Sequence, residues 1–465
     1  MSDRYKLIII GAGPGGYVAA VRAAQLGVKT AIIEKEYFGG VCLNWGCIPS
    51  KALLYVTELK RKIDGSKRLG LTAENVSIDL DKLRKHKDIT IKKLTGGVEL
   101  LLKQNGVDRF IGTASFISAN EIEVAGEEPA RLEAENFISA TGASPIDLPM
   151  LKVDGQKIIG AREAIDIPDI PEKLAVIGAG PIGVELATVY KTLGSDVAVI
   201  ELLDSVLPML DADISTACEK ALKKQKMEIL LSFKVLSSNI EGDIVEVIVE
   251  GDGREQELRF DKVLVAAGMT PNSGGLNLEK IGVELDSRGF IRVDKQMKSN
   301  IPNIHAIGDV TGGLMLAHKA SHEGIVAAEV IGGLESVVDW KAVPYAVFTD
   351  PEIAGIGLTE KEAVDSGYDI KVGLFPYNAV GKAVATLAGE GFAKVISESK
   401  TDKILGVHLF GPHSGDIIFG ASILFEKGGT AEDLGHTMAI HPTLTEALME
   451  AGLHANRKAI HILNE

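Results

Sequence analysis

"LIIIGAGPGGYVAAVRAAQLGVKTAIIE" (residues 7–34) returns, without a gap, as "LAVIGAGPIGVELATVYKTLGSDVAVIE" (residues 174–201). Each copy holds an apolar run typical of a buried strand, a G-x-G-x-x-G turn, an Ala-rich helical stretch and a second apolar run that ends in Glu. A lone Gly-rich turn would be weak evidence. A turn between a strand and a helix, with an acid about 20 residues further on, is typical of dinucleotide binding. The sequence therefore predicts an α/β protein with two Rossmann-like units.

The glycines of the two turns have separate expected roles. The first of each turn allows the tight turn, the second lets backbone approach a pyrophosphate, and the third lets helix pack on strand. These glycines are Gly11, Gly13 and Gly16 in the first copy and Gly178, Gly180 and Gly183 in the second. The acids Glu34 and Glu201 are expected to accept a hydrogen bond from an adenosine ribose.

A second, shorter repeat suggests how the two units are joined. "FISATGASP" (137–145) is similar to "VLVAAGMTP" (263–271), and each reads as a strand that runs into a small-residue turn and then Pro. The simplest layout is one nucleotide domain inserted in another, followed by a C-terminal α+β domain. We expect a first domain of residues 1–144 and 269–338, an inserted domain of 145–268 and a last domain of 339–465.

Composition narrows the class of protein. The 465 residues carry a net charge of −15, which argues against nucleic acid as the natural ligand, because phosphate binding draws on clusters of Lys and Arg. Every apolar run is interrupted well short of the roughly 18 residues that a membrane span needs. The start of the chain lacks the pattern of a secretory signal. We expect a soluble cytoplasmic protein, or alternatively one of an organelle matrix after processing.

Two of the three cysteines lie in "GGVCLNWGCIPSK" (39–51). In an ideal helix residues five apart are roughly 8.6 Å apart at Cα, beyond the roughly 7 Å limit for a disulfide. The backbone between Cys42 and Cys47 must therefore be distorted for a bridge, and Gly46 permits this. A bridge in distorted backbone tends to be labile, so a working redox pair is favoured over a metal site or two inert thiols. Cys218 reads as a small apolar residue of a helix, and no metal is expected.

A dithiol exchanges electrons by thiolate chemistry, whereas a nicotinamide carries hydride, so a flavin is the natural converter between the two. The cysteines follow closely after the first Gly-rich turn. We therefore expect one unit to bind the flavin nucleotide and the other the nicotinamide nucleotide.

With these residues assembled, the chain resembles the class I pyridine nucleotide disulfide oxidoreductases from about residue 5 to the C-terminus. The segment 39–51, "HAIGDV" (305–310) and "HPTLTE" (441–446) carry the resemblance in combination. It implies an FAD domain with an inserted NAD domain, an interface domain and a homodimer whose active sites span both subunits. Within the family the chain is most similar to members that oxidise protein-bound dihydrolipoamide. This implies a lipoyl-bearing acyltransferase or carrier protein of a 2-oxo acid dehydrogenase or glycine cleavage complex as its partner.

The resemblance also implies roles for individual residues. Cys42 would exchange with substrate, Cys47 would face the flavin, and His441 of the other subunit, oriented by Glu446, would be the acid/base. Lys51 would lie beside the flavin and pair with Glu185. The remaining expected flavin contacts are Ala114, Gly142, Asp309, Ala317 and His318. The remaining expected nicotinamide contacts are Val235 and Gly268. Three positions depart from the family's usual pattern: Val41, Pro181 and Met269.

The nearest alternative is a sibling reductase of the glutathione type. Such enzymes usually take NADPH, whose extra phosphate calls for Arg near the end of the second unit. The chain instead reads "VIELLDSVLPML" from residue 199, with Glu201 and no Arg, which favours NAD. A mercuric reductase needs cysteines at the C-terminus, and "GLHANRKAIHILNE" has none. The third alternative is a flavin-bound interaction protein without turnover.

Overall fold

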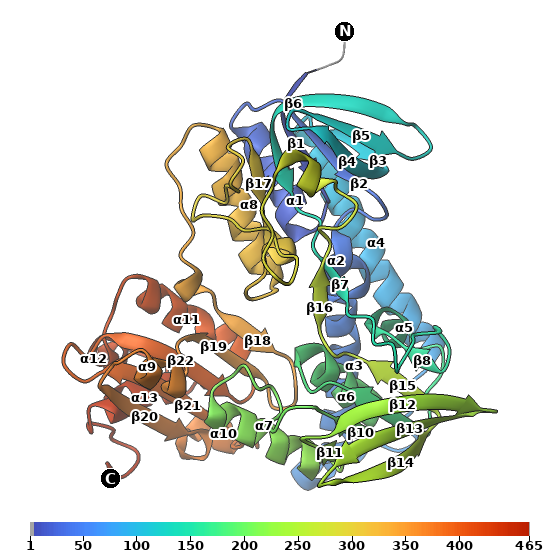
Figure 1. Cartoon of the computed structure of the whole chain (residues 1–465). Coiled ribbons are helices and arrows are strands. Elements are labelled where there is room, and N and C mark those ends of the chain that lie inside the picture. Colours follow the sequence, from blue (N-terminus) through green and yellow to red (C-terminus); the bar gives the residue numbers. More distant parts are fainter. Residues whose placement is uncertain (1–3, 465) are drawn as a thin grey trace.

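The strand β1 (Tyr5–Ile10) is the centre of the first sheet in the computed structural model, which describes residues 4–464 (Figure 1). Leu7, Ile8 and Ile9 are fully buried, as expected for an unbroken apolar run in a parallel sheet that is covered on both faces. The sheet runs β3-β2-β1-β6, and β17 pairs with β6 on the far side. Its strands are β2 (Thr30–Glu34), β3 (Asp108–Ile111), β6 (Ala130–Ser139) and β17 (Ile304–Ala306).

The two faces of this sheet are covered differently. Helices pack on one face, and an antiparallel extension of β6 packs on the other. The helices are α1 (Pro14–Gln25), α4 (Leu80–Gln104) and α8 (Ala317–Ile331), and the extension consists of β4 (Thr113–Ser118) and β5 (Glu121–Ala125). The predicted strand–turn–helix–strand unit of residues 7–34 is confirmed.

The second sheet repeats this layering around β9 (Lys173–Ile177). Its order is β11-β10-β9-β15-β8, with helices on one face and a separate three-stranded antiparallel sheet on the other. The parallel strands are β8 (Ile158–Ile159), β10 (Asp196–Ile200), β11 (Glu228–Leu230) and β15 (Lys262–Val265). The covering elements are α5 (Ala161–Asp166), α6 (Pro181–Leu193), α7 (Ala212–Lys224), β12 (Lys234–Glu241), β13 (Ile244–Gly251) and β14 (Arg254–Phe260).

Two short strands join the sheets. β7 (Ala143–Pro145) leaves the first sheet, β16 (Met269–Pro271) returns from the second, and the two pair antiparallel. The last three residues of the two copies of the short sequence repeat thus lie side by side as a connecting ribbon (Figure 1). The domain boundaries at 144 and 269 themselves stay a prediction.

The C-terminal part is an antiparallel sheet of order β18-β19-β22-β21-β20 covered by helices. Its strands are β18 (Tyr345–Val347), β19 (Ile353–Gly357), β20 (Ile370–Pro376), β21 (Phe392–Glu398) and β22 (Ile404–Phe410). Its helices are α9 (Glu360–Asp365), α10 (Gly381–Ala385), α11 (Ser414–Glu426), α12 (Ala431–His436) and α13 (Glu446–Ala455). The predicted change to α+β structure in this part of the chain is confirmed.

The helix that follows the cysteines links the two nucleotide units. α2 (Gly40–Trp45) is followed at once by α3 (Cys47–Gly65), whose Leu53 and Leu54 belong to the core of the second unit. Short 3₁₀ helices complete the chain: η1 (Ser66–Leu69), η2 (Leu278–Ile281), η3 (Gly308–Thr311), η4 (Trp340–Ala342) and η5 (Tyr377–Ala379). Within residues 4–464, no helix has the length and apolar character that crossing a bilayer requires.

Candidate active site

The first Gly-rich turn has the close contacts that the sequence pattern predicts. Gly11 has φ +102°, and a Cβ there would lie 2.3 Å from the Ala140 carbonyl oxygen. A Cβ on Gly16 would lie 1.9 Å from the Gly11 carbonyl oxygen, so α1 approaches β1 closely. Gly13 by contrast faces open space, with no atom closer than 4.0 Å to its ideal Cβ. No side chain caps α1, so its first amides are directed at that space.

The second turn has almost the same geometry. Gly178 has φ +106°, and its Cβ would lie 2.5 Å from the Ala266 carbonyl oxygen. Gly183 packs against Gly178, whereas Gly180 has nothing within 4 Å. The helix α6 also begins without a side-chain cap. Each turn therefore offers uncapped amides at a helix N-terminus, which is where a pyrophosphate binds.

The two predicted ribose acids have an additional structural contact. Glu34 accepts hydrogen bonds from the Ala12 amide at 2.8 Å and the Glu36 amide at 2.9 Å. Glu201 does the same with the amides of Ala179 at 2.7 Å and Leu203 at 2.9 Å. Each carboxylate fixes its own Gly-rich turn. In the sequence, only the spacing between each acid and its turn indicates that the carboxylate accepts hydrogen bonds from the turn. The contact of each acid with a ribose stays a prediction.

The distortion expected between the cysteines lies at Gly46. It has φ −133° and ψ −117° between α2 and α3, and it is the last residue before Cys47. A Cβ there would lie 2.9 Å from the Val41 carbonyl oxygen and 3.2 Å from the Cys42 Cα, so the close approach requires glycine. Cys42 and Cys47 are both free, half-buried thiols in this structure.

The two sulfurs are electrostatically unequal. The Cys42 thiol hydrogen-bonds to Cys47, which raises the pKa of Cys42, and burial raises it further. The same hydrogen bond lowers the pKa of Cys47; burial opposes this, and the Lys51 ammonium adds to the lowering. The arrangement therefore favours a thiolate on Cys47 and a protonated thiol on Cys42.

Lys51 lies between the two nucleotide units. Its Nζ is 2.8 Å from Glu185 Oε2 of α6, in the pairing that the resemblance implied. The other oxygen of Glu185 accepts a hydrogen bond from the Phe348 amide at 2.9 Å, and Lys51 Nζ lies 4.3 Å from the centre of the Phe348 ring. The Phe348 contacts were not predicted, because nothing in the sequence pairs residue 348 with residue 185.

Asp309 has an unusual environment for a carboxylate. Burial raises its pKa, while Lys319 lowers it and Glu323 raises it. Its carboxylate has no hydrogen bond to another described residue. Ala317 begins α8 close by in the chain, but the neighbouring His318 is exposed, with its Nε2 2.6 Å from the Pro344 carbonyl oxygen. Among residues 4–464, the Asp309 carboxylate thus has no hydrogen-bond partner.

The other predicted contacts lie in the strands and connecting segments. Ala114 is buried in β4, Val235 lies at a β-bulge of β12, and Gly142 lies in the connection before β7. Gly268 precedes β16 with φ +127°. Gly142 accepts a hydrogen bond from the Asn272 amide at 2.9 Å, so both predicted glycines belong to the ribbon between the sheets.

The departures from the family pattern have simple placements. Val41 is an exposed residue of α2, Pro181 is the first residue of α6, and Met269 pairs with Pro145 in the ribbon. Cys218 is buried in α7, where burial raises its pKa to about 12. The interpretation of Cys218 as a helix core residue is confirmed.

His441 and Glu446 form a hydrogen-bonded pair at the start of α13. His441 Nδ1 lies 2.8 Å from Glu446 Oε1, and the Thr443 amide donates to Glu446 Oε2 at 3.0 Å. Burial alone would raise the pKa of Glu446, but these hydrogen bonds hold it below its usual value. The imidazole is exposed, with 77% of the side-chain surface accessible. Figure 1 shows α13 in the C-terminal part of the molecule, apart from α2, and no hydrogen bond among the described residues joins His441 to Cys42 or Cys47.

Comparison of the sequence with models of protein families gives two matches. The family model for pyridine nucleotide-disulphide oxidoreductases matches residues 5–324, and the family model for their dimerisation domain matches residues 343–452. The chain belongs to this family. It is 44% identical to the dihydrolipoyl dehydrogenase of Thermus scotoductus over 99% of both chains. It is 41% identical to the mitochondrial dihydrolipoyl dehydrogenase of Schizosaccharomyces pombe, over 99% of this chain and 92% of the relative.

Solved structures agree with this membership. LpdA from Mycobacterium tuberculosis matches with a TM-score of 0.89 and 27% identity, covering 97% of this chain and 98% of that one. The flavoprotein disulfide reductase RclA from Escherichia coli, in its Cu(II) complex, matches with a TM-score of 0.86 and 28% identity, covering 97% and 99%.

Membership of the pyridine nucleotide-disulphide oxidoreductases confirms the predicted fold class and the predicted disulfide oxidoreductase chemistry. FAD and NAD, the predicted cofactors, are those of this family and of its dihydrolipoyl dehydrogenases. The dimerisation domain agrees with the predicted homodimer.

The buried carboxylate of Glu323, near the candidate site, was not predicted from the sequence. Glu323 of α8 is completely buried and accepts a hydrogen bond from the Gly308 amide at 2.7 Å, directly beside Asp309. In sequence it forms an i,i+4 pair with Lys319, a spacing that usually marks a solvated helix face. Nothing in the local pattern indicates that this pair is buried.

Proposed function

We propose that the chain oxidises dihydrolipoamide carried on a partner protein and transfers the electrons to NAD. The observation that carries this proposal is the pair of half-buried thiols, Cys42 and Cys47, at the Gly46 break between α2 and α3, in the segment that also holds the Lys51–Glu185 pair. Relatives that share the full length of the chain are named dihydrolipoyl dehydrogenase, which supports the choice of substrate.

The turns fit the expected nucleotides. In both, the middle glycine opens on free space and the helix begins with uncapped amides, as a pyrophosphate requires. We assign Gly11, Gly13, Gly16 and Glu34 to FAD and Gly178, Gly180, Gly183 and Glu201 to NAD. The unpartnered Asp309 carboxylate fits a ligand that offers hydroxyl donors, such as the ribityl chain of FAD. We also assign Ala114, Gly142 and Ala317 to the FAD site. We assign Val235 and Gly268 to the NAD site.

The exchange begins with a Cys42–Cys47 disulfide. A substrate thiolate attacks the Cys42 sulfur, a mixed disulfide forms, and Cys47 leaves as a thiolate. The second substrate thiol then attacks the first substrate sulfur, which closes the lipoamide disulfide and releases Cys42. The thiol on Cys42 and the thiolate favoured on Cys47 in this structure are the state that such an exchange leaves behind.

His441 of the partner subunit is proposed to move the protons of this exchange. The Glu446 hydrogen bond to Nδ1 leaves Nε2 to accept a proton from the attacking thiol and return it to Cys42. Its exposure within one chain is consistent with a role across a dimer interface.

FAD, when bound, supplies the conversion of the dithiol's electron pair into a hydride for NAD. Lys51 stabilises the Cys47 thiolate by its charge, and Glu185 holds Lys51 in place from the second unit.

The domain limits are proposed as predicted: residues 1–144 and 269–338 for FAD, 145–268 for NAD and 339–465 for the interface. The partner is proposed to be a lipoyl-bearing acyltransferase or carrier protein. The proposed location is the cytoplasm or, alternatively, an organelle matrix, since the relatives include both bacterial and mitochondrial proteins.

A steady-state assay separates this function from that of a glutathione-type reductase. Dihydrolipoamide and oxidised glutathione are each tested with NAD(H) and with NADP(H). We expect turnover with dihydrolipoamide and NAD, because Glu201 would repel the extra phosphate of NADP. Turnover of glutathione with NADPH, and none of dihydrolipoamide, would contradict the proposal. Absence of any turnover together with failure of NADH to reduce the flavin would favour an interaction protein.

A further inference from the structure

The loop that carries Asp309 is held by two oppositely charged buried side chains of α8. Lys319 and Glu323 are one helical turn apart, with 4% and 0% of their side-chain surfaces accessible, and Lys319 Nζ lies 3.0 Å from Glu323 Oε1. Two charges removed from water in this way must compensate each other and satisfy their remaining hydrogen bonds.

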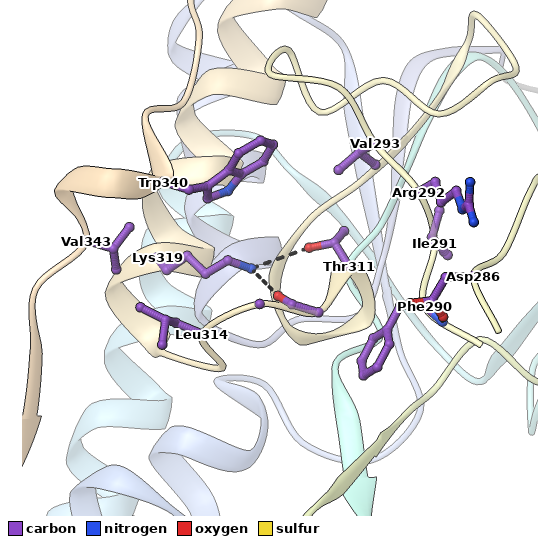
Figure 2. Close-up of a pocket in the computed structure, with 12 residues that line it drawn as sticks. Asp286, Phe290, Ile291, Arg292, Val293, Thr311, Leu314, Lys319, Trp340 and Val343 are labelled. Atoms are coloured by element: carbon purple, nitrogen blue, oxygen red, sulfur yellow. Dashed lines mark hydrogen bonds between the residues drawn. The ribbon is translucent and has the colours of Figure 1, made fainter. Parts of the chain in front are cut away.

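Both side chains contact the first residue of η3, since Lys319 Nζ lies 3.4 Å from the Gly308 carbonyl oxygen, and Lys319 alone also reaches the residue after η3. Glu323 Oε2 accepts from the Gly308 amide at 2.7 Å, immediately before Asp309. Lys319 Nζ donates to the Gly312 carbonyl oxygen at 2.9 Å, immediately after η3, and lies 3.4 Å from the Thr311 hydroxyl. Figure 2 shows the Lys319 side chain extended toward this loop. Asp309 therefore lies between two anchored points.

A third element completes the arrangement. Trp340 Nε1 of η4 donates to Glu323 Oε1 at 2.8 Å. The loop borders a cavity of about 630 Å³ that is lined by Thr311, Lys319 and Trp340 among others (Figure 2). The loop is also held by Val310, which is fully buried and whose carbonyl oxygen accepts a hydrogen bond from the Ile291 amide at 2.9 Å.

We propose that Lys319 and Glu323 are positioning residues that hold Asp309 and, through their opposite charges, balance the electrostatic potential at the bound flavin. This inference rests on the proposed function, in which Asp309 contacts FAD. A positive charge near a flavin favours the added electrons and raises the midpoint potential, whereas a negative charge lowers it. At Asp309 the two charges already act in opposite directions.

The test measures the flavin midpoint potential of holoenzymes that lack one charge or both. Glu323→Gln leaves Lys319 uncompensated and should raise the potential. Lys319→Met leaves Glu323 uncompensated and should lower it. The double variant should return close to the wild-type value. Each single variant should also release FAD about tenfold faster, because a buried hydrogen-bonded charge loses its partner.

A purely structural role predicts a different pattern. Both single variants would then lose FAD or stability without potential shifts of opposite sign, and that result would overturn the inference. Trp340→Phe serves if a charge variant fails to retain FAD, since it removes one donor from Glu323 and should lower the potential slightly; an unchanged potential and FAD release rate in Trp340→Phe would likewise overturn it.

A matched control is available in Lys394 of β21, a buried lysine paired with Asp211 at 2.8 Å and Asp213 at 2.7 Å. Lys394→Met should destabilise the fold and leave the flavin potential unchanged. A flavin-containing wild-type enzyme that turns over dihydrolipoamide, but whose variants do not shift in opposite directions, contradicts only this inference. A wild-type chain without flavin or turnover contradicts the proposed function itself.

Discussion

The unit at 7–34 and the unit at 174–201 build their turns from the same contacts, yet they differ in what lies beyond the turn. In both, the first glycine faces a carbonyl oxygen of the neighbouring strand end, and the final acid accepts two backbone amides. After the first unit the chain enters α2 and α3 with the two cysteines. From the second unit, Glu185 reaches across to Lys51 of α3.

This difference shows how one repeated fold serves two purposes. Each turn provides only a binding site for a pyrophosphate. The reactive groups lie in segments outside the turns, namely the cysteines of α2 and α3 and the Lys51–Glu185 pair. The first unit is followed in the chain by α2 and α3, and the second directs Glu185 toward Lys51 of α3, so their nucleotides are expected to meet there.

The largest expected effect is a loss of turnover without a loss of flavin, which distinguishes the role of the cysteines from that of the turn that precedes them. Cys42→Ser should lower dihydrolipoamide turnover at least about thousandfold, because the sulfur that forms the mixed disulfide is lost. Flavin content per chain should stay unchanged, since the first turn is intact. Cys218→Ala is the control and should retain activity. Full activity of Cys42→Ser would refute the exchange mechanism.

The second prediction tests which unit binds which nucleotide. Gly11→Ala places a Cβ 2.3 Å from a carbonyl oxygen and should yield protein that lacks FAD. Gly178→Ala meets a similar contact at 2.5 Å, but it should retain FAD and raise the KM for NAD by about tenfold or more, from roughly 1–3 kcal/mol of strain. Absorbance of bound flavin and NAD kinetics measure the two outcomes. The reverse pattern would exchange the assignments of the two units.

The third prediction concerns the two acids. Glu201→Ala should reduce the preference for NAD over NADP about tenfold, because it removes the charge that repels the phosphate. Glu34→Ala, the equivalent change in the first unit, should leave this preference unaltered whatever it does to FAD binding. An equal loss of preference in both variants would show that the acids act only by fixing their turns.

The smallest effect tests the contact between the units. Lys51→Met should raise the pKa of Cys47, because the ammonium that favours its thiolate is lost. The pH at which Cys47 of reduced holoenzyme becomes reactive toward iodoacetamide should therefore rise. Lys60→Met changes a lysine on the same helix that pairs with Asp64 instead, and it should have no effect. Equal profiles for all three proteins would exclude this role of Lys51.

Much of the fold could be predicted because it is encoded locally. The glycine pattern specifies the turns, the apolar runs specify the buried parallel strands, and Gly46 specifies the break between the cysteines. Contacts between distant segments could not be read in this way. The pairing of β7 with β16, the Phe348 amide on Glu185 and the burial of Lys319 with Glu323 all depend on how separate elements pack. Resemblance to a family, and not pattern, led to Lys51, His441 and Glu446.

The central claim is that the two cysteines and the flavin share electrons. Anaerobic titration of the holoenzyme with dithionite tests it directly, because a disulfide and a flavin each accept one electron pair. The wild-type enzyme should consume about twice as many electrons per bound flavin as the Cys42→Ser enzyme before it is fully reduced. Equal consumption by the two proteins would contradict the claim.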